Sequence, residues 1–170
     1  MGKDKNTKIK NALISVSNKD QLELLTQSLN ELGINIISTG GTASFIDNLG
    51  IKVKKVSDIT GFPEIMDGRV KTLHPKIYGG LLNRKEIDDA TQEEHSIQNI
   101  DLIIVNLYPF EKIIAREDCN DEMAIENIDI GGPSMIRASA KNFYTKTIVT
   151  DPNDYDLIIK ELKMNSGSTS

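Results

Sequence analysis

Apolar stretches with two different spacings alternate along the chain. Short runs rich in β-branched residues, typical of strands, occupy residues 12–17, 34–39, 51–56, 101–107 and 146–150. Between them, apolar residues at helical spacing and helix start signals predict helices over residues 19–32, 42–49, 86–97, 110–116, 121–127, 131–142 and 151–163. Strands separated by helices need crossover connections. The pattern therefore predicts an α/β fold whose mostly parallel sheet is covered by helices on both faces.

Two stretches depart from this alternation. Residues 101–107 are apolar almost throughout, as in a strand buried on both faces, so we expect this strand near the centre of the sheet. Residues 57–84 contain glycine or proline at six positions that interrupt every candidate periodicity, which predicts a long loop region. Long irregular segments in compact domains are often functional, so this region is a candidate site.

Composition narrows the class of protein. The chain has 170 residues, a formal net charge of -5 and a single cysteine, Cys119. This length can bury a core without disulfide or metal support, and one Cys excludes an intramolecular disulfide, so we expect a cytoplasmic protein. No apolar run approaches the roughly 20 residues of a membrane span. The acidic balance argues against nucleic-acid binding, which favours a small-molecule partner.

The chain ends differ in composition from the middle. We expect residues 1–10, polar and rich in Lys, to be a flexible segment, and residues 11–164 to form the domain. Residues 165–170 read as a turn or linker, because they consist almost entirely of Asn, Ser, Gly and Thr.

Candidate phosphate-binding groups follow the first two predicted strands. Ser15 and Lys19 follow the first, and Thr39-Gly40-Gly41-Thr42 follows the second and opens a helix. Glycines allow backbone amides to approach an anion, and the helix dipole favours negative charge there. An ordinary tight turn with Thr42 as N-cap fits the same residues. No Walker A or G-x-G-x-x-G pattern is present, so nucleotide hydrolysis and dinucleotide binding lose their usual support.

Basic residues gather in the interrupted region. Arg69 and Lys71 alternate around Val70, so in an extended segment they project to one side and could clamp an anion. Solvated surface residues are the other interpretation, which we favour for Lys76. His74 has no partner at triad or metal-ligand spacing, so we expect a structural hydrogen bond from it.

Further candidates follow the later strands. Tyr108 precedes Pro109 at the end of the 101–107 strand, and Asp129 precedes a helix whose free amides could stabilise an oxyanion. Ser134, Arg137 and Lys141 share one face of that helix. Taken alone, Tyr108 also fits core packing, Asp129 a helix cap, and Arg137 with Lys141 a solvated stripe.

Taken together and in order, five motifs carry a resemblance to a known family: STGGTA, GFPEIMDGRVKTLHPK, NLYPF, ENIDIGGPS and ASAKN, at residues 38–43, 61–76, 106–110, 126–134 and 138–142. Over about residues 10–163 the chain closely resembles the IMP cyclohydrolase domain of bifunctional AICAR transformylase/IMP cyclohydrolase. The resemblance implies a methylglyoxal-synthase-like three-layer fold. The implied reaction closes 5-formamidoimidazole-4-carboxamide ribotide to IMP with loss of water, without metal or organic cofactor.

The resemblance also implies a set of site residues. The catalytic set falls on Lys71, Tyr108, Asp129 and Lys141. The implied substrate-binding residues are Ser15, Lys19, Thr39, Gly40, Gly41, Thr42, Arg69, Thr72, Asn106, Ile130, Gly131 and Gly132. Our hypothesis is that Asp129 accepts the amide proton, that Lys141 and the amides of Ile130 and Gly131 stabilise the oxyanion, and that Lys71 and Tyr108 orient the formyl group and help protonate the leaving hydroxyl.

The sequence departs from the family pattern in one large respect, and two other functions compete with the cyclohydrolase interpretation. These 170 residues do not include the formyltransferase domain that usually follows in this family, and the homodimer expected of the full-length enzyme rests on the resemblance alone. A lyase acting on dihydroxyacetone phosphate shares the fold and a phosphate cradle. A non-catalytic module that senses a phosphorylated metabolite would need the cradle but not Lys71, Tyr108 or Asp129.

Overall fold

The computed structural model describes residues 6–170. In chain order their elements are β1 (Thr7–Lys8), β2 (Asn11–Val16), α1 (Leu22–Glu31), β3 (Asn35–Ser38), α2 (Gly40–Asn48), β4 (Val53–Lys55), α3 (Val56–Thr60), α4 (Pro75–Leu82), α5 (Asp89–Glu94), β5 (Leu102–Asn106), α6 (Phe110–Ile114), α7 (Asp121–Glu126), α8 (Gly131–Lys141), β6 (Thr147–Val149), a 3-10 turn (Pro152–Asp154), α9 (Tyr155–Met164) and β7 (Ser168–Thr169). No helix among them is long and apolar enough to cross a membrane.

The predicted α/β fold is confirmed. Five parallel strands form one sheet in the order β4-β3-β2-β5-β6, and β2 lies in the middle. Leu13 of β2 pairs in register with Ile37 of β3 and Ile103 of β5. The apolar run predicted to be central is β5, an interior strand beside β2.

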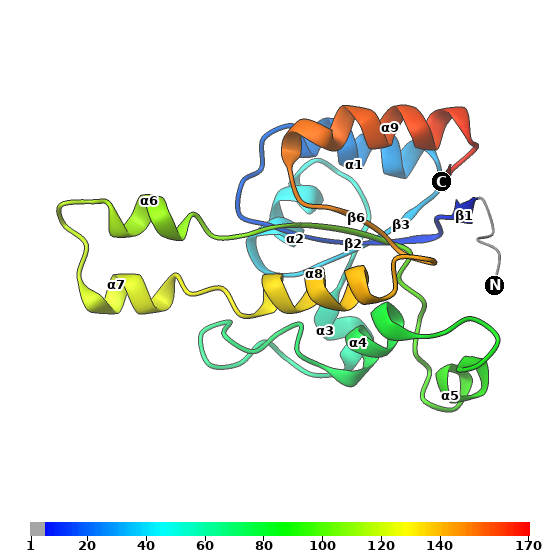
Figure 1. Cartoon of the computed structure of the whole chain (residues 1–170), viewed down its shortest axis with the longest axis horizontal. Helices are drawn as coiled ribbons and strands as arrows, with labels where there is room; N and C mark the ends of the chain where they lie inside the picture. Colours follow the sequence, from blue (N-terminus) through cyan, green and yellow to red (C-terminus); the bar gives the residue numbers. More distant parts are fainter. Residues whose placement is uncertain (1–5) are drawn as a thin grey trace.

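Alternating side chains of the sheet feed two cores. Ala12, Ile14 and Val16 of β2 pack with the buried faces of α1 and α9, and Leu13 packs with α3, α4 and α8. Figure 1 shows the result as three layers, with α1 and α9 on one side of the sheet and α3, α4 and α8 on the other. Because all strands run the same way, their carboxyl ends meet at one edge, which is where ligands bind in such sheets.

The long loop predicted over residues 57–84 was partly wrong. Its ends form α3 and α4, and the irregular part is residues 61–74. Helix α4 begins at Pro75 after the N-cap His74, whose Nδ1 accepts a hydrogen bond from the Lys76 amide at 3.1 Å. Gly80 lies inside α4 because a Cβ there would come within 2.4 Å of the Gln98 carbonyl oxygen. That glycine permits close packing and does not end the helix.

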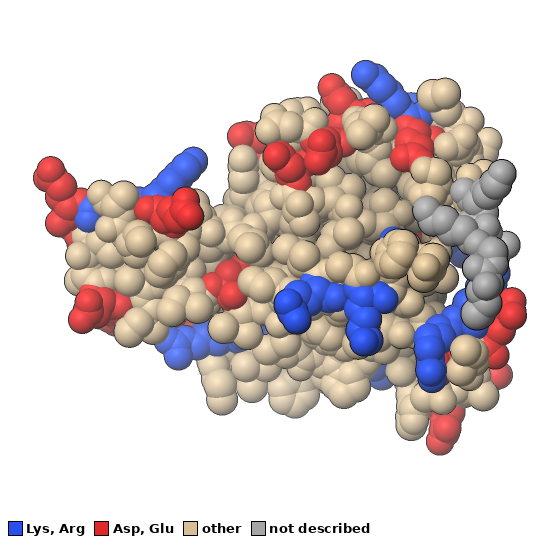
Figure 2. Space-filling view, in the orientation of Figure 1, with Lys and Arg blue, Asp and Glu red and all other residues tan. Residues whose placement is uncertain are grey.

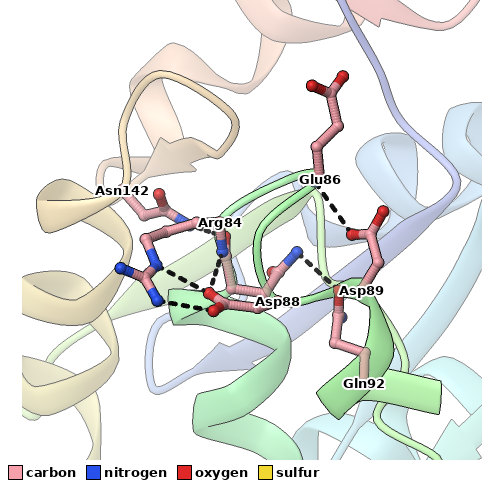
Figure 3. A network of polar contacts seen from close by, with 7 residues as sticks. Arg84, Glu86, Asp88, Asp89, Gln92 and Asn142 are labelled. Atoms are coloured by element: carbon pink, nitrogen blue, oxygen red, sulfur yellow. Dashed lines mark hydrogen bonds and ion pairs between the residues drawn. The ribbon is translucent and has the colours of Figure 1, made fainter.

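The segment between α4 and α5 is fixed by side-chain hydrogen bonds (Figure 3). Arg84 donates from Nη2 and Nε to the two carboxylate oxygens of Asp88, at 2.7 and 3.0 Å, and lowers the pKa of Asp88 to about 2. The Nδ2 groups of Asn83 and Asn142 donate to Gln92 Oε1 and to the Asn83 carbonyl oxygen, at 3.1 and 2.7 Å. The network therefore joins this segment to the end of α8.

A buried lysine anchors the same part of the fold. Lys146 is 4% exposed, and its Nζ donates to the carbonyl of Gly80 at 2.9 Å and to the side-chain oxygens of Asn83 and Asn99 at 2.8 and 2.5 Å. Burial lowers the pKa of Lys146 to about 8, and the charge of Asp101 opposes that shift. Full hydrogen bonding offsets the cost of placing an ammonium group in the interior.

The two ends of the described chain pair with each other, where the sequence predicted a flexible segment at residues 1–10 and a turn or linker at residues 165–170. Thr7 and Lys8 of β1 form antiparallel pairs with Thr169 and Ser168 of β7. Ile9 and Thr169 are buried. Residues 165–170 are thus not a free linker, and of the segment 1–10 expected to be flexible, residues 1–5 lie outside the described residues.

Helices α6 and α7 project from the body as a helical arm, residues 107–130 (Figure 1). Neither helix contains a buried residue. Several large apolar side chains of the arm are exposed, among them Ile114, Ile125 and Ile128. Figure 2 shows acidic side chains at its outer end. The base of the arm meets the carboxyl end of β5 and the start of α8.

Candidate active site

A cavity of about 630 Å³ lies at the carboxyl edge of the sheet. It is bounded by the ends of β2, β3 and β5, by the irregular loop 61–74, by the base of the arm and by the first turns of α2 and α8. Its lining residues are Ser15, Val16, Ser17, Lys19, Thr39, Gly41, Thr42, Asp67, Gly68, Arg69, Lys71, Thr72, Leu73, Asn106, Tyr108, Ile125, Glu126, Ile128, Asp129, Ile130, Gly131, Gly132 and Met135.

The N-terminus of α2 forms one end of the cavity. Thr39 is the N-cap residue with an extended backbone, and Gly40 has a φ of 53°, a conformation that favours glycine. The amides of Gly41 and Thr42 belong to the first helical turn, where no intrahelical carbonyl is available to them. The Thr42 hydroxyl is already used, because it donates to the Val16 carbonyl at 3.0 Å and accepts from the Val16 amide at 3.2 Å. The backbone amide of Thr42, and not its hydroxyl, is therefore the donor that this residue offers to an anion.

A carboxylate that the sequence analysis did not identify contacts the same helix end. Glu64 Oε1 accepts a hydrogen bond from the hydroxyl of Thr39 and another from the amide of Gly40, the latter at 3.1 Å. Glu64 lies within the family motif, but its position beside α2 depends on how the loop folds back. No local sequence signal reports such a contact.

The irregular loop folds as a tight hairpin over the cavity. Ile65 and Val70 form an isolated antiparallel bridge, and between them Met66 and Asp67 have φ of 54° and 53°, followed by Gly68 at 83°. Non-glycine residues in the left-handed region cost roughly 1 kcal/mol or more each. The loop conformation therefore depends on the contacts that its side chains make with α2 and the arm.

Two basic side chains of this loop line the cavity. The Arg69 guanidinium forms an ion pair with Glu126 of α7, which raises the pKa of Arg69 through hydrogen bonding and charge. Lys71 extends toward α2: its Nζ is 3.6 Å from the position that a Cβ on Gly40 would take. The prediction that Arg69 and Lys71 project to one side assumed an extended segment. In the hairpin they diverge, with Arg69 beside the arm and Lys71 beside the expected phosphate site.

The loop after β2 is shaped by Asn106 at the end of β5. Asn106 Oδ1 accepts from the amides of Ser17 and Asn18 at 2.7 and 2.9 Å, and its Nδ2 donates to the Asn18 carbonyl at 2.9 Å. These bonds hold the turn that carries Lys19 into the cavity. Asn106 lines the cavity as well, so positioning of this turn is a role that the sequence did not indicate.

The N-terminus of α8 also lines the cavity. Asp129 Oδ1 accepts from the Gly132 amide at 2.8 Å, as a local cap of the helix. A Cβ on Gly132 would lie 2.6 Å from Asp129 Oδ2 and 2.7 Å from Leu107 Cδ2, so glycine is required for this close approach. Pro133 has no amide hydrogen, which leaves the amides of Ile130 and Gly131 as the donors of this helix end.

Lys141 does not line the cavity, so the structure does not bring it together with the other predicted catalytic residues. It is exposed at the last residue of α8, ten residues after Gly131, which corresponds to roughly 15 Å along the helix axis. Sharing a helix face with Ser134 did not bring Lys141 to the helix start.

The other predicted residues gather at one place. All of them except Gly40 and Lys141 line the cavity, and the Gly40 amide is held by Glu64 at its edge. The sequence analysis did not select several lining residues, among them Ser17, Asp67, Glu126 and Met135. Within residues 6–170, no group of three or more His, Cys, Asp or Glu side chains is arranged to hold a metal ion.

Comparison with known proteins agrees with this architecture. Residues 21–134 match the model of the MGS-like domain, a segment that runs from α1 to the first turn of α8. The fold is similar to the crystal structure of ForH, with a TM-score of 0.84 and 34% sequence identity over 93% of this chain and 80% of ForH. MGS-like domains are typically enzymes. The chain belongs to the MGS-like domain family.

Proposed function

We propose that the protein is an IMP cyclohydrolase, which closes 5-formamidoimidazole-4-carboxamide ribotide to IMP and releases water. One observation carries this proposal: a single cavity is lined both by a helix end with free amides, with Lys19 and Lys71, and by a carboxylate next to a second helix end. A volume of about 630 Å³ lies in the usual range for ligand pockets and leaves room for a base and ribose beside a phosphate. Dihydroxyacetone phosphate would fill only part of it.

The phosphate is assigned to the α2 side. The amides of Gly41 and Thr42 and the ammonium group of Lys19 are donors of the kind that bind phosphate monoesters. Placing the phosphate there directs the base toward α8 and the arm. The ring atoms that react then lie near Asp129.

Ring closure needs a proton acceptor and oxyanion donors. The carboxamide nitrogen attacks the formyl carbon and forms the new C–N bond, and we assign its proton to Asp129. Oδ2 of Asp129 has no hydrogen-bond partner among the described residues, since Gly132 binds Oδ1. The amides of Ile130 and Gly131 are assigned to the oxygen that becomes negative.

Dehydration completes the reaction. The oxyanion takes up the proton that Asp129 accepted and becomes a hydroxyl. A second proton converts this hydroxyl to water as the C–O bond breaks, while the formamido nitrogen loses its proton as the C=N bond forms. Tyr108, 42% exposed at the cavity, and Lys71 are the assigned sources of the proton for the leaving hydroxyl. Each group acts from the cavity wall, and no cofactor enters the scheme.

The test is direct assay with the formylated ribotide, following the absorbance change of IMP formation. We expect turnover by the wild type and its loss in Asp129→Asn. Asp118→Asn is the matched control, because Asp118 pairs with Arg116 on the arm outside the cavity. Phosphate release from dihydroxyacetone phosphate would instead identify a lyase. Binding of IMP without turnover of either substrate would identify a sensing module.

A further inference from the structure

The donors at the start of α2 are already bound to an internal anion. Thr39, 4% exposed, and the Gly40 amide both donate to the same oxygen of Glu64. These two donors belong to the group that the family motif assigns to the substrate phosphate. In the structure a carboxylate of the chain itself therefore satisfies part of the anion site.

Lys71 lies in the same region as this carboxylate. Its Nζ and Glu64 Oε2 are each 3.9 Å from the point where a Cβ on Gly68 would be. Glu64 thus balances the positive end of the α2 dipole, with the ammonium group of Lys71 in the surroundings. A phosphate at the Gly41 and Thr42 amides would bring up to two negative charges next to the one on Glu64. Like charges at such distances oppose each other, more strongly where water is partly excluded.

Glu64 is also held in a way that can change. It lies in a hairpin with left-handed Met66 and Asp67, and the other end of this hairpin is tied by the ion pair of Arg69 with Glu126, in which both side chains are about half exposed or more, 62% and 49%. Exposed ion pairs are weak. Displacing Glu64 therefore breaks two hydrogen bonds without disturbing either core.

We propose that Glu64 is an internal competitor of phosphate: it occupies the N-terminus of α2 in the free protein, leaves Thr39 and Gly40 when a phosphate-bearing ligand binds, and so sets the affinity of the site for phosphorylated ligands. The inference rests on the proposed placement of phosphate at α2. It names a determinant of affinity and not a catalytic residue, since Glu64 does not line the cavity that contains Asp129.

The variant Glu64→Gln tests it by calorimetry. Glutamine keeps the accepting oxygen and the size of the side chain but removes the charge. We expect the Kd of IMP and of inorganic phosphate to fall about tenfold, and that of inosine, which has no phosphate, to change less than about twofold. Asp47→Asn is the matched control, because it removes one charge from the exposed far end of the same helix. We expect it to leave all three affinities nearly unchanged.

A second measurement uses Glu64→Ala, which removes the internal anion. Inorganic phosphate should raise the Tm of this variant by more than it raises the Tm of the wild type, since the ion replaces a lost partner. If Glu64→Ala does not fold, the same comparison is made with Glu64→Gln.

The outcomes separate this inference from the proposed function. Weaker IMP binding by Glu64→Gln, or an equal change for IMP and inosine, overturns the inference even if the enzyme is active. So does failure of phosphate to bind or stabilise either protein. If Glu64→Gln binds phosphate more tightly than the wild type but the wild type does not close the ring, the inference is supported and the cyclohydrolase assignment is rejected.

Discussion

The cavity has two helix ends, and they hold their carboxylates differently. At α8 the Gly132 amide is bound by Asp129, three residues earlier in the chain, whereas at α2 the Gly40 amide is bound by Glu64, which is 24 residues away. A local cap is fixed by the backbone that carries it. A remote one depends on the fold of a separate loop.

The glycine pairs at the starts of α2 and α8 look alike in sequence but have different surroundings. Both helices begin with a glycine pair, but only the pair at α8 is crowded: a Cβ on Gly132 would meet Asp129 and Leu107, and one on Gly41 would meet nothing within 4 Å. The α8 end presents a fixed carboxylate to the cavity. The α2 end leaves open space beside Gly41, although Glu64 binds the Gly40 amide next to it.

The largest effect is expected for Asp129→Asn. Asparagine still offers an oxygen to the Gly132 amide, so the free energy of unfolding should change little, while loss of the proton acceptor lowers kcat by about 10²–10⁴-fold. Steady-state kinetics and urea unfolding of the same preparation check both parts. A fall in kcat of only a few fold would reduce Asp129 to a helix cap and remove the contrast between the helix ends.

The next effect is a pH dependence of the free energy of unfolding, and it comes from Lys146, which lies outside the cavity. Lys146 has a pKa of about 8 in the folded protein and an ordinary value of 10.5 in the unfolded chain. Between these values the unfolded state holds a proton that the folded state lacks, so stability rises with pH over this window, by about 3 kcal/mol in total. Below pH 8 the contribution is constant.

Urea unfolding of the wild type and Lys146→Met across pH 7 to 11 measures this contribution as the difference between the two curves. Methionine removes the titrating group, so the wild type should gain stability relative to the variant as pH rises from 8 to 10.5. Parallel curves for the two proteins would show that Lys146 keeps an ordinary pKa.

A pair of alanine substitutions tests the crowding directly. Gly132→Ala should lower the free energy of unfolding by about 1–3 kcal/mol and reduce kcat, because Asp129 or Leu107 must move. Gly41→Ala should leave stability unchanged or raise it by up to about 1 kcal/mol, as expected for glycine replacement in a helix. Equal losses of stability in Gly132→Ala and Gly41→Ala would contradict the distinction between a crowded glycine at α8 and an uncrowded one at α2.

The smallest effect is expected for Glu126→Gln. The ion pair with Arg69 is exposed, so stability should change by less than about 1 kcal/mol. Release of Arg69 toward the cavity should tighten IMP binding by about twofold, less than Glu64→Gln does. Titration calorimetry at low and high salt checks this, and a gain larger than that of Glu64→Gln would make the arm, and not α2, the place where ligand binding is opposed.

Much of the fold could be predicted because strand and helix periodicities are local. The parallel sheet follows from β-branched runs such as residues 101–107 separated by amphipathic helices. The helix α4 was missed because Gly79 and Gly80 read as breaks, although Gly80 permits packing against the Gln98 carbonyl. The strand β7 was missed because two residues carry no periodicity.

The site was predictable where it depends on strand ends. Lys19, Thr39 and Tyr108 line one cavity because parallel strands bring their following residues to one edge, and Asp129 reaches it from the start of α8. Lys141 was misplaced because a shared helix face says nothing about distance along the axis. Glu64 was missed because its contact with α2 is tertiary.

The short pairing of β1 with β7 bears on how the chain folds. Thr7 and Thr169 are partners from opposite ends of the described chain, so their contact closes a loop that contains every other element. Closing so long a loop is entropically unfavourable until the intervening structure has formed. These strands are therefore expected to assemble last and to open first, and their amides should exchange hydrogen faster than those of β2 and β5 in the native state.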